Sequence, residues 1–438
     1  MLNGERRNGQ GRNGKFQSSL ETGRGVPVSG AGSSGERQLS IYLDHSATTP
    51  ICAEAIAAIN DVFQSQWGNP SSTHRWGERS ALALEMARIQ VGALIGADPT
   101  EIFFTSGGTE ADNWALLGVA RQHQQPQHLV ISSVEHSAIA KTADFLETQG
   151  WTVTRLPVDH VGRVSPQDLS AALRPNTALV SIIHGQSEVG TVQPIEALGK
   201  IAHAAGVLFH VDAVQTAGRM PIDLRTLPVD LLSLSSHKIY GPQGAGALYV
   251  RSGVAISSLL LGGGQESRLR AGTQAVATIA GFGAAAERIA QEMTIETKRL
   301  TGLRDRLFVG LATSGALQPT GDPVHRLPHH ASFCLALDGW KTLNTPPSGW
   351  DLVRQLNSAS IAVSSGSACN SGTLSPSPVL LSMGYRETEA IGALRFSLGR
   401  STQMVDIDWT VKVVNQVLKR LGCETAPALV HPARLVNL

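Results

Sequence analysis

The sequence is poor in cysteine, carries almost no net charge and contains no long apolar run. Its four cysteines, at positions 52, 334, 369 and 423, lie too far apart for a disulfide framework or a CxxC metal motif. This usage is typical of a reducing compartment, so we expect a cytoplasmic location. The apolar runs are short and interrupted by Ser, Gly or His, so we expect no membrane-spanning segment and no membrane partner.

Positive and negative charges nearly cancel, with 36 Lys and Arg against 35 Asp and Glu. Without a basic stripe the chain lacks the electrostatic footprint of a nucleic-acid-binding protein, and we expect no direct binding to nucleic acid. Hydrophobic residues make up 42% of the chain, as in ordinary globular proteins. A chain of 438 residues is too long for one simple core, which favours a large domain and a smaller one.

Residues 1–40 are rich in Gly, Ser, Asn and Arg and show no apolar periodicity. Such a segment buries too little surface to offset the entropy of ordering, so we predict a disordered tail. It lacks the apolar centre of a secretory signal. An organelle transit peptide is the alternative, and the three acidic residues of the segment weigh against it.

From position 41 onward, short β-rich runs alternate with longer helical patterns. Two of the helical patterns are 111–122 and 195–206, and the strand-like runs are 101–106, 128–133, 151–158, 178–183, 207–212, 230–236 and 246–250. Alternation of nearly continuous apolar strands with helices predicts an α/β fold, with a mainly parallel seven-stranded sheet covered by helices.

The Ala- and Gly-rich stretch 275–293 predicts a long helix that leaves this domain. Three further runs beyond it indicate a smaller α+β unit. These runs are 331–339, 361–369 and 393–399. We therefore divide the chain into the tail (1–40), an N-terminal segment associated with the small domain (41–58), a large domain (59–295) and a small C-terminal domain (296–438).

Chemically useful side chains follow the ends of several predicted strands, where open parallel sheets bind ligands. Asp212 ends one strand, and Lys238 follows the next strand, 26 residues later. This spacing is one strand–helix–strand step, so we expect both side chains at the same edge of the sheet. His136 follows a third strand, and the run Gly107-Gly108-Thr109 follows a fourth at the start of a helix.

Each of these residues alone has an ordinary structural explanation, but together they fit pyridoxal phosphate. That cofactor requires a lysine for its aldehyde, a carboxylate at its pyridinium nitrogen, a phosphate cradle and a flat group over its ring. Lys238, Asp212 and His136 are the expected lysine, carboxylate and stacking group. Small residues at a helix N-terminus suit an anion. The expected phosphate and phenolic-oxygen ligands are Gly108, Thr109, Ser235, His237 and Gln215.

Cys369 lies in the polar run "SSGSACNSG", 364–372, which offers a thiol little to pack against. We predict a surface loop, and an exposed thiol is tolerated where its reactivity is used. A cofactor that withdraws electrons from a bound cysteine makes the substrate sulfur electrophilic, so a thiolate can take it. Cys369 is the expected nucleophile and His136 its candidate base, whereas we expect the other three cysteines to be packing residues.

Arg395 lies in the strand-like run "GALRFSLG", where an unpaired guanidinium would be costly. A bidentate contact with the α-carboxylate of an amino acid would satisfy it. His325, His329 and His330 form a small cluster, but no Cys or carboxylate completes a ligand set, so we expect no metal site.

At these residues the chain resembles the cysteine desulfurases of the group that serves nitrogenase and iron–sulfur cluster assembly. The matching runs span residues 42 to about 400 in the family's order: "YLDHSATTP", "GNPSSTHRWG", "FFTSGGTEADN", "HVDAVQTAGR", "LLSLSSHKIYGPQGAGALYVR", "GGGQESRLRAGT", "SSGSACNSG" and "ALRFSLGR".

The resemblance implies a fold-type-I pyridoxal-phosphate enzyme that forms a homodimer. It implies conversion of L-cysteine to L-alanine, with the sulfur left on Cys369 as a persulfide for a protein acceptor, either a scaffold or a sulfur shuttle. Thr273 would reach the phosphate of the neighbouring subunit's cofactor, and Arg395 would hold the substrate carboxylate. Gln186 occupies the position of a family Asn that contacts cofactor and substrate, within Gly185-Gln186-Ser187-Glu188 in place of Ala-Asn-Asn-Glu.

Two alternatives remain open. A selenocysteine or cystine lyase of the same fold would not require Cys369, because selenium leaves more easily. A catalytically silent regulatory relative is the second alternative, raised by the departures at Gln186 and Ser187.

Overall fold

The computed structural model describes residues 40–312, 314–336, 340, 347–366 and 375–422. From Ser40 onward these residues form one compact unit. The predicted tail lies outside the described residues except for Ser40.

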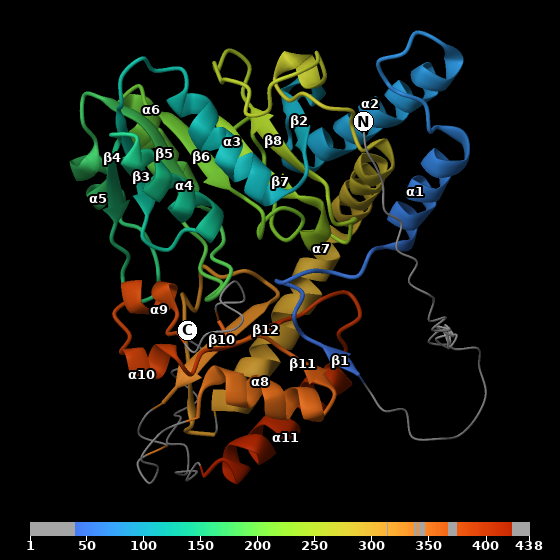
Figure 1. The fold of residues 1–438 in the computed structure, drawn as a ribbon. Helices are drawn as coiled ribbons and strands as arrows, with labels where there is room; N and C mark the ends of the chain where they lie inside the picture. The colour runs from blue at the N-terminus through green and yellow to red at the C-terminus, as the bar shows by residue number, and fades with distance from the viewer. Residues whose placement is uncertain (1–39, 313, 337–339, 341–346, 367–374, 423–438) are drawn as a thin grey trace, which may run out of the picture. The chain divides into compact units, whose positions relative to one another are not determined.

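A seven-stranded sheet is the centre of this unit (Figure 1). Its strand order is β2-β8-β7-β6-β5-β3-β4, and only β8 runs antiparallel to its neighbours. The strands are Ile102–Thr105 (β2), His128–Ser132 (β3), Thr152–Leu156 (β4), Thr177–Ile183 (β5), Leu208–Asp212 (β6), Leu231–Ser235 (β7) and Gly246–Val250 (β8). The predicted α/β class, the seven strand-like runs and the mainly parallel sheet are confirmed.

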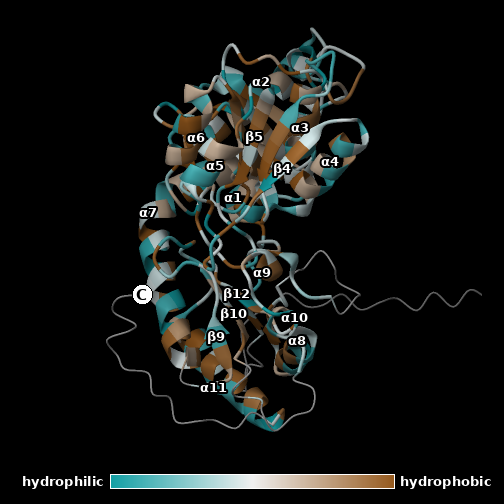
Figure 2. Cartoon of the chain, turned by 90° about the vertical axis from the view of Figure 1, so that its left-hand side faces the viewer, coloured by the Kyte–Doolittle hydropathy of each residue, from teal (hydrophilic) through white to brown (hydrophobic). Residues whose placement is uncertain are grey.

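Helices cover both faces of the sheet because its inner strands are apolar on both sides. One face packs against α3 (Gly108–Ala120) and α4 (Ser137–Thr148). The other face packs against α2 (Arg75–Ile95), α5 (Pro166–Ala172), α6 (Ile195–Ala204) and the first half of α7 (Val276–Ala312). Figure 2 shows hydrophobic residues concentrated in the strands and mixed with hydrophilic residues on the helices.

A second group of strands follows α7. Leu317–Pro319 (β9), His330–Leu335 (β10) and Leu394–Ser397 (β12) form an antiparallel sheet of order β12-β10-β9. Ile41–Tyr42 (β1) pairs in parallel with Ile361–Ala362 (β11). The helices here are Gly349–Ser358 (α8), Pro378–Ser382 (α9), Glu387–Ala390 (α10) and Met404–Arg420 (α11), and they complete the predicted smaller α+β part.

Helix α7 is longer than the sequence predicts, because it continues past position 293 to Ala312. The β-branched pair Thr294-Ile295 disfavours a helix locally, but burial of later residues such as Leu300 and Leu307 outweighs this preference. The helix packs against α2 and against α1 (Ala53–Ser65), and farther along against α11, β9 and β10. The proposed domain boundaries at 58/59 and 295/296 fall inside α1 and α7, and the division stays a prediction.

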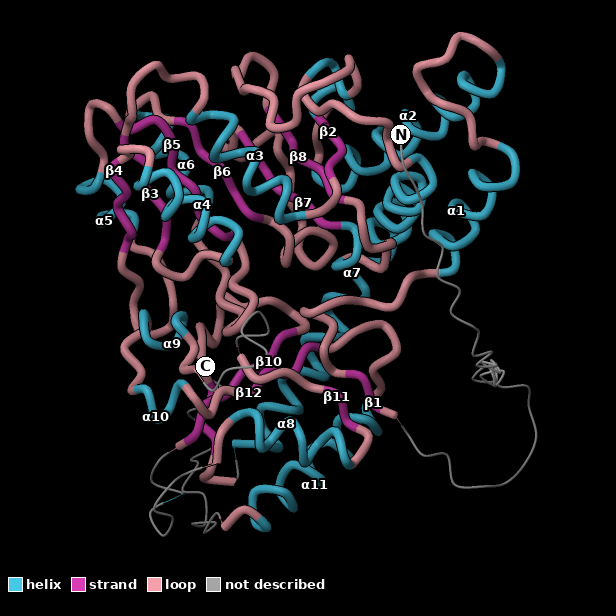
Figure 3. The backbone as a smooth tube through the Cα atoms, viewed as in Figure 1, coloured by secondary structure: helices cyan, strands magenta, loops and turns pink. Residues whose placement is uncertain are grey.

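Short one-turn helices occur at Pro99–Glu101 and Ser236–Lys238, and Glu266–Arg268 forms a turn whose three residues have positive φ. Loops that follow the carboxyl ends of the parallel strands lie between the large sheet and the second group of strands (Figure 3). Within the described part of the chain, no helix combines the length and apolarity needed to cross a membrane.

Candidate active site

Asp212 and Lys238 lie at the carboxyl ends of neighbouring parallel strands. Asp212 is the last residue of β6, and Lys238 ends the helical turn that follows β7. Burial is the largest influence and raises the pKa of Asp212, whereas electrostatic interactions with His136 and Lys238 and a hydrogen bond from the Val214 N–H to Oδ1 at 2.9 Å lower it. Three of the predicted site residues therefore act on one another electrostatically at one edge of the sheet.

The segment Asp44–Thr48, which we call the strap, passes over this edge. Lys238 Nζ donates to the carbonyl oxygens of Ser46 and Ala47 at 2.6 and 2.7 Å, and Gln215 Nε2 donates to Ser46 O at 2.9 Å. The hydroxyl of Thr48 lies 3.1 Å from His237 Nδ1. The strap thus contacts three of the residues that the sequence predicts as cofactor ligands.

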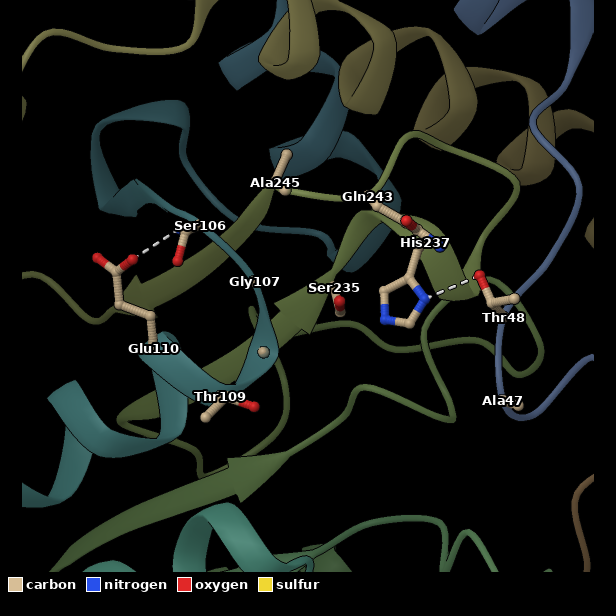
Figure 4. A pocket seen from close by; sticks show the side chains of 12 residues that line it. Ala47, Thr48, Ser106, Gly107, Thr109, Glu110, Ser235, His237, Gln243 and Ala245 are labelled. Atoms are coloured by element: carbon tan, nitrogen blue, oxygen red, sulfur yellow. Dashed lines mark hydrogen bonds between the residues drawn. The ribbon is translucent and has the colours of Figure 1, made fainter. Parts of the chain in front are cut away.

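A cavity of about 530 Å³ opens between the strap and the start of α3. Figure 4 shows Thr109, Ser235 and His237 around this space, with Thr48 of the strap on its other side. Its lining includes four predicted phosphate ligands, namely Gly108, Thr109, Ser235 and His237. Asp212, Lys238 and His136 are not part of the lining.

The cavity suits a phosphate group. The first N–H groups of the 13-residue helix α3 open onto it at Gly107-Gly108, and the dipole of the helix favours an anion there. A Cβ atom at Gly108 would lie 2.7 Å from Val214 Cγ2, so a larger residue would require the Val214 side chain or the start of the helix to move. Burial and the charge of Lys238 lower the pKa of His237 to about 4, so its imidazole is neutral at pH 7.

Glu110 also lines this cavity, and a free carboxylate there would repel phosphate. Its two oxygens accept hydrogen bonds from Arg270 Nε and Nη2 at 2.9 and 3.2 Å and from the Ser106 N–H at 2.8 Å. Although burial opposes them, these contacts hold the pKa of Glu110 below its ordinary value. The charge is therefore paired, and the cavity keeps the positive character of the helix N-terminus.

His136 is the N-cap of α4, where its Nδ1 accepts a hydrogen bond from the Ala138 N–H at 3.2 Å. This contact places the Nδ1 lone pair toward the helix and leaves Nε2 as the other polar atom of the ring. The preceding residue, Glu135, is buried, and its Oε1 accepts hydrogen bonds from Ser132 Oγ and the Ile183 N–H at 2.5 and 2.8 Å. Burial raises the pKa of Glu135 to about 8.

Arg395 lies on β12 with its side chain 4% exposed. Nη2 donates to Asp44 Oδ1 at 2.9 Å, and Nη1 donates to Ser187 O at 3.0 Å. Nε is shielded from solvent and has no hydrogen-bond partner among the described residues. An unsatisfied buried guanidinium donor is costly, so this side chain suits an anionic ligand.

The side chain of Gln186 is directed toward main-chain groups. Oε1 accepts hydrogen bonds from the N–H groups of Glu188 and Val189, and Nε2 donates to Val134 O at 3.2 Å. The amide therefore stabilises the loop after β5. Its contact with the cofactor and the substrate stays a prediction.

The remaining residues that the sequence analysis singled out do not line the cavity or lie outside the described residues. Cys369, the expected nucleophile, lies outside the described residues. Thr273 is exposed on the loop before α7, away from the lining of the cavity in this subunit. Cys334 is buried and Cys52 is half-buried against the core, as expected for packing residues.

Sequence reasoning missed the strap and the carboxyl groups around Asp212. Asp44, Ser46 and Ala47 belong to the run "YLDHSATTP", which carried the resemblance without an assigned role. Asp112 on α3 is buried, and burial together with the charge of Asp212 raises its pKa well above its ordinary value. The signal for Asp112 was an acidic residue among the apolar positions of a helical pattern.

Comparison with known proteins places this site in a family. The family model described as Aminotransferase class-V matches residues 41–409. The chain is 42% identical to "Cysteine desulfurase IscS" of Methanosarcina thermophila over 383 residues, which cover 87% of this chain and 93% of that protein. It is 43% identical to "Cysteine desulfurase" of Trichormus azollae over 382 residues, which cover 87% of this chain and 93% of that protein.

Solved structures agree with these sequence relatives. A structure titled "NifS-like protein" matches with a TM-score of 0.80 and 34% identity over 87% of this chain and all of that chain. The "NifS-like protein from Rickettsia africae" matches with a TM-score of 0.78 and 29% identity over 87% of this chain and all of that chain. The fold is therefore that of the fold-type-I enzymes, and the chain belongs to the class-V aminotransferase family and, within it, to the cysteine desulfurases.

Proposed function

We propose that this protein is a pyridoxal-phosphate-dependent cysteine desulfurase that converts L-cysteine to L-alanine and transfers the sulfur to Cys369. The observation that carries the proposal is the position of Asp212 and Lys238 at neighbouring strand ends. The family supports it, because class-V aminotransferases in general use this cofactor. L-Cysteine and the Cys369 thiol together have the atoms of L-alanine and a Cys369 persulfide, so the net step needs no further reactant.

The residues of the site fit the cofactor. The α3 N-terminus, Thr109, Ser235 and His237 would bind its phosphate, and Lys238 would bind its aldehyde. Asp212 would pair with its ring nitrogen, and His136 would lie over its ring. When bound, the cofactor supplies an electron sink that weakens the bonds at Cα and Cβ of the substrate.

The protein groups would hold the substrate and manage its protons. Arg395 would bind the α-carboxylate through the donors that Asp44 and Ser187 leave open. Lys238 would move the α-proton once its Nζ leaves the two strap carbonyls. His136 would act as the base for the Cys369 thiol, which is mostly protonated at neutral pH. Gln186 supports this site through the loop after β5.

We further propose a homodimer with Thr273 at the neighbouring subunit's cofactor phosphate. Exposed apolar side chains on α1, α2 and the turn between them support a subunit interface, because such a group is unusual on a monomer. These are Phe63, Trp67, Trp76, Leu82 and Met86. We propose a cytoplasmic location and a scaffold or sulfur-shuttle protein as acceptor, consistent with a role in iron–sulfur cluster assembly.

The test starts with the purified protein, which should be yellow and should release alanine and sulfide from L-cysteine when a thiol reductant is present. Lys238→Ala should lose both the covalently bound colour and the activity. Cys369→Ser should keep the colour but form no persulfide. Desulfuration of L-cysteine by Cys369→Ser at the original rate would show that the nucleophile is misassigned.

The same experiment separates the two alternatives. The Cys369→Ser variant tests the first alternative, because a selenocysteine lyase does not require this thiol. Loss of L-cysteine turnover with retained selenocysteine turnover would show that Cys369 is needed for the release of sulfur and not of selenium. Protein that is colourless as isolated and binds no added cofactor would instead support a catalytically silent relative.

A further inference from the structure

Tyr240 adopts a backbone conformation that is unusual for its residue type. Its φ is 68°, in the left-handed region, where a Cβ atom crowds the main chain. This conformation is costly for an aromatic residue, and it persists only where the surrounding contacts hold it. Tyr240 is buried and lies two residues after Lys238. The strained position is therefore next to the lysine that we assign to the cofactor aldehyde.

The main chain around Tyr240 is bound to the residue that follows the strap. Thr49 Oγ1 accepts a hydrogen bond from the Tyr240 N–H at 2.8 Å and donates to His237 O at 2.9 Å. The Tyr240 carbonyl oxygen accepts from the Cys52 N–H at 2.8 Å. Lys238 thus lies between two residues whose main chains bind the same hydroxyl group.

The side chain of Tyr240 contacts two arginines from distant parts of the chain. The guanidinium groups of Arg219 and Arg400 lie over its ring, at 5.0 and 4.6 Å from the centroid, where the ring attracts a cation. The hydroxyl oxygen accepts from Arg219 Nη1 at 3.1 Å and from the Arg400 N–H at 3.0 Å. Arg219 Nη2 also donates to Lys238 O at 3.3 Å. Tyr240 therefore connects the Lys238 turn to the chain just after β12, the strand that carries Arg395.

Helix α7 holds both arginines in place. Thr297 Oγ1 donates to Arg219 O at 2.8 Å, and Arg400 forms an ion pair with Glu292. The helix packs against α2 near its start and against β9, β10 and α11 farther along. The contacts of Tyr240 are therefore fixed relative to both sheets.

We propose that Tyr240 is a positioning residue for Lys238, which fixes the main chain of the lysine turn relative to Arg395 through its hydroxyl group and its left-handed backbone. The proposal rests on the proposed function and adds a residue to it. In that function Lys238 has to reach the α-proton of a substrate held by Arg395. A lysine side chain is flexible, so its main chain must determine where Nζ can act.

This role separates the rate of proton transfer from the affinity for substrate. Reacting groups must be held about 3–3.5 Å apart, and a misplacement of about 1 Å can lower the rate about a hundredfold. Loss of the Tyr240 contacts should therefore slow proton transfer more than it weakens binding. A residue that only stabilised the fold would not produce this difference.

The experiment uses the full-length holoenzyme in D2O with L-alanine. NMR measures the rate at which the α-hydrogen is exchanged for deuterium, and the absorbance of the cofactor measures the dissociation constant. Tyr240→Phe keeps the ring but removes the oxygen that accepts from Arg219 and Arg400. The exchange rate should fall at least fivefold, and the dissociation constant should stay within twofold. Tyr240→Leu also removes the ring and should be slower than Tyr240→Phe.

Tyr249→Phe is the matched control. Tyr249 is also a buried tyrosine, but it pairs with Leu232, near the end of β7 that is far from Lys238. This variant should change neither value.

A second measurement needs neither bound cofactor nor amino acid. Amide hydrogen exchange, followed by mass spectrometry on the purified protein, reports on the peptide that carries residues 236–241. This peptide should exchange at least fivefold faster in Tyr240→Phe than in the wild type, because the turn loses its link to the two arginines. Tyr249→Phe should leave its exchange unchanged.

A fall of less than fivefold in the α-hydrogen exchange rate of Tyr240→Phe would overturn the proposal, and so would an equal loss of rate and affinity. If this variant does not retain the cofactor, the peptide measurement decides, and unchanged amide exchange would overturn the proposal. Failure of the proposed function is distinguishable, because the wild-type protein itself would then exchange no α-hydrogen. The peptide measurement would still decide whether Tyr240 fixes the turn.

Discussion

Asp44 and Arg395 form an ion pair at 2.9 Å although 351 residues separate them in the sequence. The pair joins the strap to β12, and its guanidinium is the group that we assign to the substrate carboxylate. Asp44 therefore neutralises part of the charge that would attract the substrate.

Asp44→Asn should strengthen binding of amino-acid carboxylates. Asparagine keeps an oxygen for Arg395 Nη2 but removes the negative charge that competes with the ligand. We expect the dissociation constant of L-alanine to fall about three- to tenfold, which corresponds to roughly 1 kcal/mol at a partly screened site. The change is measured by titrating the holoenzyme with L-alanine and following the absorbance of the cofactor.

Asp44→Glu is the control for this prediction, because it keeps the charge and should not tighten binding. Weaker L-alanine binding in Asp44→Asn would mean that the charge of Asp44 orients Arg395 more than it competes with the ligand.

Glu135→Gln should flatten the dependence of stability on pH. The pKa of Glu135 is about 8 in the folded protein against an ordinary value of 4.5, so the folded state keeps a proton that the unfolded state has lost. Its favourable contribution to the free energy of unfolding is fully present below about pH 4.5 and is lost as the pH rises through about 8. Glutamine does not titrate, so the melting temperature of Glu135→Gln, relative to that of the wild type at the same pH, should rise between pH 5 and pH 9. Parallel curves for the two proteins would contradict this.

Arg88 and Glu266 form a buried, bidentate ion pair at 2.9 and 3.1 Å, and Glu266 also accepts from the Phe104 N–H. Arg88→Met should lower the free energy of unfolding by about 3–5 kcal/mol, because it leaves a carboxylate buried without its partner. Adding Glu266→Gln should recover part of the loss. Denaturant unfolding measures both changes.

A surface pair provides the comparison. Arg306 and Asp408 form an ion pair in which each side chain is 50% exposed. Arg306→Ala should cost only about 0–1 kcal/mol. Equal losses for Arg88→Met and Arg306→Ala would show that burial of the first pair carries no penalty.

Gln186→Asn introduces the residue that is usual in the family, yet it should destabilise this protein. The shorter side chain cannot reach Val134 O while it accepts from the N–H groups of Glu188 and Val189. We expect a loss of about 1–2 kcal/mol, typical of a buried hydrogen bond left unmade. Thermal unfolding measures this loss, and Gln186→Glu, which keeps the length of the side chain, is the comparison variant. An increase in stability would indicate that the loop adopts the conformation of the relatives.

The central sheet and its strand-end residues could be predicted because their signal is local. Apolar runs such as 207–212 and 230–236 define strands, and parallel pairing brings Asp212 and Lys238 to one edge. The N-terminal position of Gly108 on α3 follows from the same reasoning. Roles that depend on a single side chain, such as that of Cys369, stay predictions.

The strap and the Glu188 contacts could not be predicted because they depend on pairings between distant parts of the chain. Asp44 reaches Arg395 because the chain just after β1 pairs with Ser397 on β12, and Glu188 meets Ser377 across 189 positions. The spacing of apolar residues within either segment does not indicate such a contact. The length of α7 was underestimated for a related reason, since its second half is stabilised by the small sheet and α11.

The pairing of Ile41 with Ile361 has a consequence for biosynthesis. β1 and the strap that follows it are translated before the central sheet, but β11, the strand partner of β1, and Arg395 are translated more than three hundred codons later. The strands of the central sheet can pair in the meantime, whereas the site is complete only after Arg395 has been translated. Nascent chains halted before codon 361 should therefore be unable to retain the coenzyme.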